Sequence, residues 1–341
     1  MAGGQGTRFW PYSTEKVPKQ FLSIVGKQPL ILQTYNRLKA FIRRDNIYIV
    51  ADRKYLKLTQ KSIPGFREAN FIAEPSPKNT APCLILANIV LSRKDPDANI
   101  LVVPADHYIP DLDIFTEQMR DALEFADNPA MITAGITPHT PHTGYGYINF
   151  DPSRSERLNQ TRFFEVKAFK EKPKLPRARK YVRKRNYYWN SGMFVYKLKY
   201  FREFIEEYNP YYAEQYEQLE KTFKDKNKFR AVFNRITPKS IDFALMEKMK
   251  AVKMFQAKFS WSDVGAWSSV FELNARDSKG SVNINNHVAI DSHNCLLFST
   301  ENKPIAAIGI DDLVVINTPE GILVAPMDQV QKVKDVVGLL K

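Results

Sequence analysis

The sequence is poor in cysteine and has no long apolar run. Cys83 and Cys295 are its two cysteines in 341 residues, and they lack the spacing of a metal site. We expect both to be small buried side chains in a protein of a reducing compartment, the cytoplasm. No apolar stretch approaches the roughly 20 residues of a bilayer-spanning helix, and no signal-peptide pattern is present. A membrane protein is therefore not expected.

Acidic residues are fewer than basic ones, 37 against 50, so the net charge is +13. This balance can accompany nucleic-acid binding, which would be steeply salt-dependent. However, the basic residues are dispersed, and the denser runs at 177–185 and 221–230 lie in helix-like stretches, where a solvated face is the usual explanation. A substrate with several phosphates also favours a basic protein. We expect a nucleotide ligand and no nucleic acid.

The order of sequence patterns predicts an α/β protein, long enough for one large domain and a small second one. Short apolar segments alternate with helical patterns, as in a parallel sheet covered on both faces. The early strands are expected at 47–51, 71–73, 100–103 and 131–135, and the early helices at 29–42, 80–91 and 112–126. Thr80, followed by Pro82, is a good cap for the second of these helices.

Further strands are expected in the next part of the chain, which makes the sheet mixed but mostly parallel. These strands are predicted at 145–150, 163–170 and 193–196. A basic helix at 175–185 and aromatic helices between 198 and 223 lie among and after them.

The pattern changes near residue 277. Short β-like segments separated by Asn, Asp and Ser follow at 288–290, 295–298, 305–308 and 313–316. A helix is expected from Asp328, with Gln331 placed for a capping-box contact. We therefore divide the chain into a large domain, residues 1–276, and a small β-domain, residues 277–341, closed by this helix.

The most informative segment is the glycine-rich start of the chain. Gly3, Gly4 and Gly6 let backbone N–H groups approach an anion, because no Cβ is in the way. Arg8 adds a planar donor fork suited to phosphate oxygens, and Lys19 adds a second cation. The segment is neither a Walker loop nor a dinucleotide fingerprint. It predicts a loop that holds a polyphosphate.

Two aspartates each follow a predicted strand. Asp106 follows the strand at 100–103, and Asp263 follows one at 252–259. The carboxyl ends of parallel strands face the ligand crevice, and Mg²⁺ usually takes one or two carboxylates from a protein. A turn or helix cap is the alternative for Asp106, and His107 beside it is expected to be structural.

The motifs Ala2-Gly-Gly-x-Gly-Thr-Arg8-Phe-Trp-Pro11 and Pro18-Lys-Gln-Phe21 resemble the signature of sugar-1-phosphate nucleotidyltransferases, in their mannose-1-phosphate guanylyltransferase branch. Gly144-Tyr-Gly-Tyr-Ile148, Glu171-Lys-Pro173 and Trp189-Asn-Ser-Gly-Met-Phe194 are similar to further motifs of the family, in the family's order. Without the resemblance, the first of these would be a turn entering a strand and the second a surface ion pair.

The resemblance implies a Rossmann-like nucleotidyltransferase domain followed by a short left-handed β-helix. It implies that GMP passes from GTP to mannose 1-phosphate, giving GDP-mannose and pyrophosphate, with Mg²⁺ held by Asp106 and Asp263. The implied catalytic residues are Arg8, Lys19, Asp106, Lys172 and Asp263. The implied nucleotide-binding residues are Ala2, Gly3, Gly4, Gly6, Thr7, Arg8, Glu74, Asn79 and Thr80. The implied sugar-phosphate-binding residues are Gly146, Glu171, Lys172 and Asn190.

Several alternatives stay open at this point. The sugar could be another hexose or a heptose phosphate, and a non-catalytic GDP-mannose sensor would need fewer of these charged residues. The segment Ser240-Ile-Asp242 is typical of a helix cap, although the family has a similar segment near its active site. Strand edges or an apolar helix face of the small β-domain could support a homodimer.

Only Met1 precedes Ala2, although the phosphate loop of a doubly wound domain normally follows a central strand. We therefore expect this chain to be less stable than a version extended by about eight apolar residues.

Overall fold

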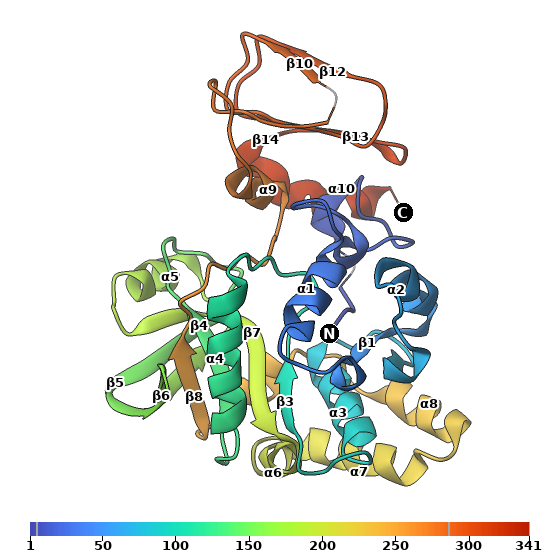
Figure 1. Ribbon diagram of the computed structural model, residues 1–341, viewed down its shortest axis with the longest axis vertical. Coiled ribbons are helices and arrows are strands. Elements are labelled where there is room, and N and C mark those ends of the chain that lie inside the picture. Colours follow the sequence, from blue (N-terminus) through green and yellow to red (C-terminus); the bar gives the residue numbers. More distant parts are fainter. Residues whose placement is uncertain (5, 286, 341) are drawn as a thin grey trace.

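The computed structural model describes residues 1–4, 6–285 and 287–340. Figure 1 shows a larger α/β part below and a smaller part of short strands above. Helices α9 (Trp267–Leu273) and α10 (Val333–Leu339) lie between the two parts. The predicted α/β class is confirmed.

The largest sheet among the described residues has six strands, in the order β3-β7-β4-β8-β6-β5. Their bounds are β3 Asn99–Val102, β4 Met131–Ile136, β5 Tyr147–Leu158, β6 Thr161–Lys170, β7 Tyr187–Lys197 and β8 Val252–Gln256. Strands β3, β4, β8 and β5 run in one direction, and β7 and β6 run in the other. The sheet is therefore mixed, as predicted. Four of its six strands share one direction, but in this order of described strands β4–β8 is the one parallel neighbouring pair.

Separate apolar cores cover the two faces of this sheet. Met131 and Ile132 are adjacent in β4 and fully buried, and they belong to different cores because successive side chains of a strand alternate between faces. Helices α1 and α4 contribute to one core, and α3, α6 and α7 to the other. The helices of this part are α1 Leu30–Lys39, α2 Leu56–Ser62, α3 Thr80–Leu91, α4 Leu112–Phe125, α5 Leu175–Val182, α6 Leu198–Tyr208, α7 Pro210–Thr222 and α8 Lys226–Arg235.

One detail of α3 corrects the sequence interpretation. The helix begins at Thr80 as expected, but its cap is Asn79, whose side-chain oxygen accepts from the Thr80 N–H at 2.8 Å. The Thr80 hydroxyl instead accepts from the backbone N–H of Ile241, at 2.8 Å. Thr80 therefore ties α3 to a segment 161 residues away in the sequence.

Strands β1 (Ile49–Asp52) and β2 (Phe71–Glu74) form a separate parallel pair. The first two residues of the chain connect β1 with the end of β3. The Met1 nitrogen donates to the carbonyl oxygen of Val103 at 2.8 Å, and the Ala2 N–H donates to the carbonyl oxygen of Val50 at 2.9 Å. Met1 and Ala2 thus lie between the two strands, where a central strand would end.

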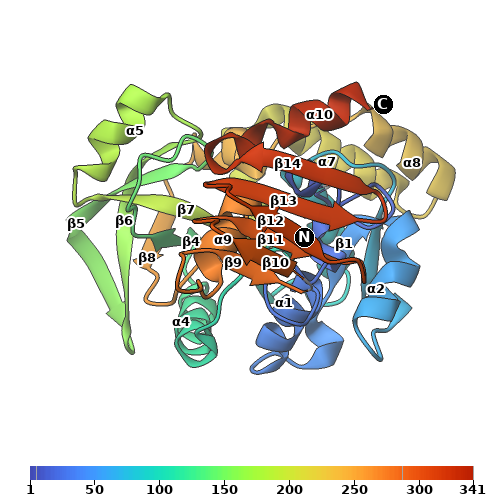
Figure 2. The ribbon, with the colours of Figure 1, turned by 90° about the horizontal axis from the view of Figure 1, so that it is seen from above.

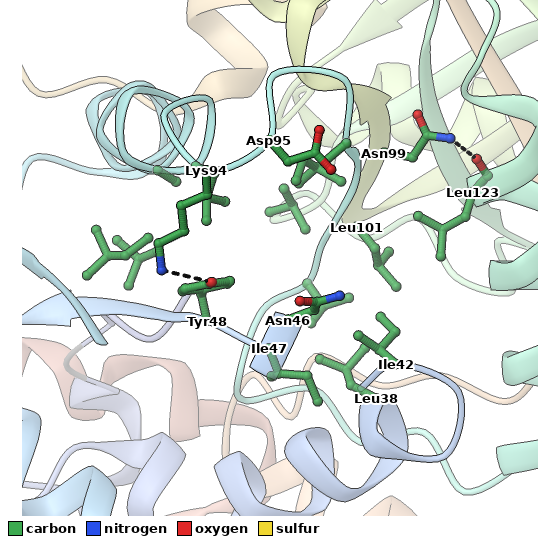
Figure 3. Close-up of a pocket in the computed structure, with 18 of the residues that line it drawn as sticks. Leu38, Ile42, Asn46, Ile47, Tyr48, Lys94, Asp95, Asn99, Leu101 and Leu123 are labelled. Carbon is green, nitrogen blue, oxygen red and sulfur yellow. Dashed lines mark hydrogen bonds between the residues drawn. The ribbon is translucent and has the colours of Figure 1, made fainter. Parts of the chain in front are cut away.

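A cavity of about 460 Å³ begins at Met1 and extends between β1 and β3. Figure 3 shows Leu38, Ile42, Leu101 and Leu123 among the apolar side chains that line it. The cavity lies where a doubly wound sheet has its central strand. The stabilising effect of an apolar extension remains a prediction, and this cavity is the place where such a segment would pack.

The smaller part consists of short strands that cover the larger part when seen from above (Figure 2). They form two layers, with β10 and β12 above β13 and β14 in Figure 1. Strands β9, β11 and β13 are parallel neighbours, β14 pairs with β13 in the antiparallel sense, and β10 pairs with β12 in parallel. The bounds are β9 Val282–Ile284, β10 His287–Ile290, β11 Leu296–Ser299, β12 Ile305–Ile308, β13 Leu313–Thr318 and β14 Gly321–Pro326. The four predicted β-like segments correspond to β10, β11, β12 and β13, whereas β9 and β14 were not predicted.

The terminal helix begins differently from the prediction. A 3₁₀-helix spans Met327–Lys332 and continues into α10. Its cap position is Pro326, the last residue of β14, and it makes no side-chain cap hydrogen bond. The predicted capping box of Asp328 and Gln331 is therefore wrong, because the chain passes directly from the strand into the helix.

Both cysteines are buried free thiols. In the part of the chain that the structure describes, no helix is long and apolar enough to cross a membrane.

Candidate active site

The glycine-rich loop leaves Ala2 and turns at Gly6 into a short 3₁₀-helix, Thr7–Phe9. Gly6 has φ 63°, and a Cβ at this position would lie 2.3 Å from the Cβ of Lys19. Glycine is therefore required there by both the backbone conformation and the contact. Gly3 and Gly4 are exposed, so their backbone is accessible to a ligand.

Arg8 and Lys19 line one polar pocket of about 250 Å³ together with both candidate metal-binding aspartates, Asp106 and Asp263. The buried Lys19 ammonium donates to Asp106 Oδ2 at 2.9 Å and to the carbonyl oxygen of Asp263 at 2.6 Å. The four residues come from separate segments of the chain, and the fold brings them together in one pocket, as expected from the sequence.

The charge balance of this pocket is set by the Lys19–Asp106 pair. Burial by itself would raise the pKa of Asp106, but the charge and hydrogen bond of Lys19, with further contributions from His107 and the backbone, together hold this pKa below its ordinary value. Burial also lowers the pKa of His107 to about 4, so its ring is neutral near pH 7. His107 Nδ1 accepts from the indole N–H of Trp261 at 3.1 Å, which agrees with the structural role expected for it.

A second pocket of about 180 Å³ contains Gly146, Glu171 and Asn190, three of the four predicted sugar-phosphate-binding residues. A Cβ on Gly146 would lie 2.5 Å from Glu171 Oε2, so the absence of a side chain makes room for that carboxylate. Asn190 is held at both ends of its amide. Its oxygen accepts from the Thr133 hydroxyl at 3.0 Å, and its nitrogen donates to Asp242 Oδ1 at 2.9 Å.

Lys172 is the fourth residue of that set, and it lies outside the pocket lining. Its side chain is 55% exposed, and its ammonium lies 2.8 Å from Glu171 Oε1. Its backbone has φ 45° and its N–H donates to the carbonyl oxygen of Tyr145 at 3.2 Å. Lys172 therefore sits at the rim, next to the carboxylate that lines the pocket.

The two pockets share His107 and Asp263, so they form one continuous cleft. The Tyr145 hydroxyl donates to Asp263 Oδ1 at 2.7 Å at this junction. Burial and the Asp263 charge raise the pKa of Tyr145, so the phenol stays protonated as a donor. Asp263 is thus oriented by Tyr145 at the place where the two halves meet.

The residues predicted to hold the base and ribose are more dispersed. Thr80 lines the second pocket. Glu74, at the end of β2, is buried, and burial raises its pKa to about 7. Glu74 Oε2 lies 3.5 Å from the position of a Cβ on Gly3, which places it beneath the loop. Asn79 caps α3 next to Thr80, and neither Glu74 nor Asn79 lines the two polar pockets.

Comparison with known proteins identifies the family. A model described as nucleotidyl transferase matches residues 1–280, and one described as MannoseP isomerase/GMP-like beta-helix domain matches residues 285–340. The chain belongs to the nucleotidyl transferase family. The resemblance inferred from the motifs is confirmed, as are the enzyme class and the β-helix-like end of this nucleotidyltransferase.

Individual relatives match over nearly all of this nucleotidyltransferase. Mannose-1-phosphate guanylyltransferase of Escherichia coli is 34% identical, over 99% of this chain and 74% of the relative. Alginate biosynthesis protein AlgA of Pseudomonas aeruginosa is 34% identical, over 99% of this chain and 70% of the relative. A crystal structure from Thermus thermophilus, named mannose-1-phosphate geranyltransferase, superposes with TM-score 0.88 at 29% identity and covers 100% of this chain and 97% of its own.

Two side chains of the nucleotidyltransferase cleft were missed as site residues. Tyr145 lies in the glycine-containing motif, but a hydrogen bond across 118 residues to Asp263 leaves no local trace in the sequence. Asp242 was considered as a helix cap; it lines the second pocket and begins a π-helical turn, Asp242–Met246. Burial, with a smaller contribution from Glu171, raises the pKa of Asp242 to about 6. The family-like order of Ser240-Ile-Asp242 was the one signal that could have identified it.

Proposed function

We propose that this nucleotidyltransferase transfers GMP from GTP to mannose 1-phosphate, with GDP-mannose and pyrophosphate as products. The observation that carries the proposal is the meeting of two unlike pockets at Asp263 and His107. One pocket has a cationic, glycine-rich loop suited to phosphates, and the other has amide and carboxylate groups suited to sugar hydroxyls. The choice of guanine as the base and mannose as the sugar comes from the similarity to a relative named mannose-1-phosphate guanylyltransferase.

The reaction follows as a direct displacement. An oxygen of the sugar phosphate attacks the α-phosphorus of GTP, a new P–O bond forms, and the bond to the β-phosphate oxygen breaks as pyrophosphate leaves. A phosphate monoester loses its second proton near pH 6, so the nucleophile is already anionic and needs no general base. Catalysis then consists of positioning and of stabilising charge on the leaving group.

Each group of residues has a role in this proposal. Arg8 and the backbone amides of Gly3, Gly4, Gly6 and Thr7 hold the β- and γ-phosphates. Lys19 neutralises the α-phosphate, and Lys172 at the rim reaches the sugar phosphate. The hexose lies against Gly146, Glu171 and Asn190. The base and ribose lie near Ala2, Glu74, Asn79 and Thr80.

The residues present suit a single Mg²⁺ bound between protein and substrates. Asp106 and Asp263 offer two carboxylate groups in one pocket. Mg²⁺ prefers such oxygen ligands and usually takes one or two carboxylates from a protein. The described residues contain no group of three or more metal-ligating side chains, so further positions would be filled by phosphate oxygens and water. When bound, the ion would neutralise charge on the phosphates of both substrates.

A homodimer is part of the same proposal. The small β-domain exposes apolar side chains on the paired strands β10 and β12 and on β14 of its other sheet, which a second copy could cover. These side chains are Val288, Ile290, Ile308, Ile322 and Val324. Light scattering at several concentrations should give a dimer, and a monomer at high concentration would refute this.

The test is pyrophosphate release with Mg²⁺, with GTP, ATP, UTP and dTTP each combined with mannose 1-phosphate or glucose 1-phosphate. We expect release with GTP and mannose 1-phosphate and far less with every other pair. Preference for a different pair, or no release with any of them, would overturn the assignment.

A further inference from the structure

The loop that carries Arg8 shares its apolar core with the far end of the chain. Phe9 is 1% exposed and meets the Trp267 ring edge-on, with centroids 5.2 Å apart. Trp267 in turn contacts Phe298 of β11 at 5.2 Å, and Phe298 contacts Tyr12 at 5.0 Å. These rings belong to the core formed by strands β9, β11, β13 and β14, and not to either core of the main sheet.

Polar contacts also connect the loop with α9 and with strand β13 of the small β-domain. The indole N–H of Trp267 donates to the carbonyl oxygen of Trp10 at 3.3 Å. The hydroxyl of Thr318, the last residue of β13, lies 3.4 Å from the carbonyl oxygen of Pro11. A Cβ on Gly321 would lie 3.1 Å from the ring of Trp10, so the strand approaches the loop closely. The C-terminal helix α10 also contacts the 3₁₀-helix Thr7–Phe9 (Figure 1).

Arg8 is exposed between anchored residues. Gly6 on one side contacts Lys19, which is ion-paired in the cleft, and Phe9 on the other side is buried under Trp267. The backbone between these anchors has 3₁₀ geometry and belongs to no strand. The direction of the Arg8 side chain and of the nearby amides therefore depends on where Phe9 is held.

We infer that the small β-domain positions the phosphate-binding loop, with Phe298 and Thr318 as positioning residues that act through Phe9, Tyr12 and Pro11. The inference rests on the proposed function of the cleft. A preorganised donor loses much of its effect when it must be ordered during the reaction. Weakening the contact between the small β-domain and the phosphate-binding loop should therefore lower kcat/KM, although no residue that touches substrate is changed.

Strand β11 provides a matched pair of variants. Leu297 and Phe298 are adjacent and buried, but Leu297 faces the separate small core with Cys295 and Ala307, away from the loop. Both Leu297→Ala and Phe298→Ala leave a cavity in the same domain. If Phe298 served only to stabilise the small β-domain, the two variants would change catalysis and loop exchange to the same extent.

The experiment measures GTP-dependent pyrophosphate release and amide hydrogen exchange of the peptide 6–13 in the full chain. We expect Phe298→Ala to lower kcat/KM about tenfold and to speed exchange of this peptide, with Leu297→Ala staying within about threefold. Phe298→Leu, which keeps apolar contact, should recover part of the loss. Thr318→Val keeps the shape of the side chain and removes the hydroxyl, which lies near the carbonyl oxygens of Pro11 and Gly321 and accepts from the Glu320 N–H. It should lower kcat/KM and speed exchange of the peptide 6–13 by less than Phe298→Ala does.

Equal effects of Phe298→Ala and Leu297→Ala on both readouts would overturn the inference. The exchange measurement separates this result from a failure of the proposed function, because it needs no turnover. If the wild-type chain releases no pyrophosphate, faster loop exchange in Phe298→Ala alone still supports the positioning role, and equal exchange in the two variants refutes it.

Discussion

The two ends of the cleft are held in place by different parts of the molecule. At the end proposed for the sugar, Asn190 is a residue of strand β7, and its amide is fixed by Thr133 of neighbouring β4 and by Asp242. At the end proposed for the triphosphate, Arg8 belongs to a loop whose apolar residues pack against the small β-domain.

This difference separates two ways of building a binding site. A side chain on a central strand is oriented by the hydrogen bonds around it, so its neighbours alone determine its position. A loop has no such frame, and it acquires a fixed shape through contacts supplied by another part of the chain. Substitutions near the sugar end should therefore affect only the binding of the sugar phosphate. Binding and catalysis at the phosphate end should also be affected by substitutions in the distant β-domain.

The largest effect is expected at Asp106, which lines the phosphate pocket beside the shared residues His107 and Asp263. Asp106→Asn keeps the size of the side chain and removes the charge that pairs with Lys19, so kcat should fall at least about 100-fold. Pyrophosphate release at saturating GTP measures this. Asp127→Asn is the matched control, because Asp127 pairs with Lys197 at an exposed site outside the cleft. Near-normal kcat in Asp106→Asn would contradict the metal-binding role.

The next largest effect isolates the phosphate end. Arg8→Ala should cost about 2–4 kcal/mol of transition-state stabilisation, or roughly 30- to 1000-fold in kcat/KM. Arg8→Lys should recover little of this loss, because an ammonium lacks the planar fork. Arg8 is exposed, so the melting temperature should not change. Lys16→Ala, an exposed cation in the same segment, serves as the control, and an equal loss there would show a general charge effect.

A smaller and more selective effect is expected at the sugar end. Asn190→Ala should raise KM for the sugar phosphate about tenfold and leave KM for GTP nearly unchanged. Thr133→Val, which removes a donor to the Asn190 amide, should shift the same KM by less. Initial rates with each substrate varied in turn would measure both constants. An equal rise in KM for GTP would show that the two ends of the cleft do not bind the two substrates separately.

The cavity between β1 and β3 provides a test that concerns stability alone. An apolar extension of about eight residues before Met1 should raise the melting temperature by at least about 4 °C, because its side chains would be buried between the two strands. An extension of the same length made of Gly and Ser is the control. Equal melting temperatures for the two extended proteins would refute the expectation.

The smallest effect concerns the pH dependence of stability. Burial raises the pKa of Glu74 from 4.5 to about 7 in the folded chain. Between these values the folded state keeps a proton that the unfolded state has released, so stability falls as pH rises through this range. Glu74→Gln should therefore reduce the decrease in melting temperature between pH 5 and pH 8. An unchanged decrease would show that Glu74 has an ordinary pKa.

Much of the fold and part of the site could be predicted from local sequence patterns. The limits of α3 and the segments of β10 to β13 follow from short-range periodicity. That Asp106 lies in one pocket with the glycine-rich loop was implied by the family resemblance. The β-domain boundary at residue 277 and the roles of the site residues stay predictions.

What the sequence did not reveal depends on contacts between distant segments. Thr80 looked like a helix cap because the competing bond to Ile241 comes from 161 residues away. Tyr145 and Asp242 become site residues through Asp263 and Asn190, which lie far from them along the chain. Phe298 has the pattern of an ordinary core residue, and its contact with Tyr12 appears only when the two parts of the molecule pack together.

The most direct test of the account follows the oxygen atoms of the reaction. Mannose 1-phosphate labelled with ¹⁸O in its phosphate group is incubated with unlabelled GTP, Mg²⁺ and the wild-type chain, and both products are analysed by mass spectrometry. Direct attack of the sugar phosphate on the α-phosphorus predicts that all label appears in GDP-mannose and that pyrophosphate is unlabelled. Label in pyrophosphate would contradict the displacement, and the absence of GDP-mannose would contradict the proposed activity itself.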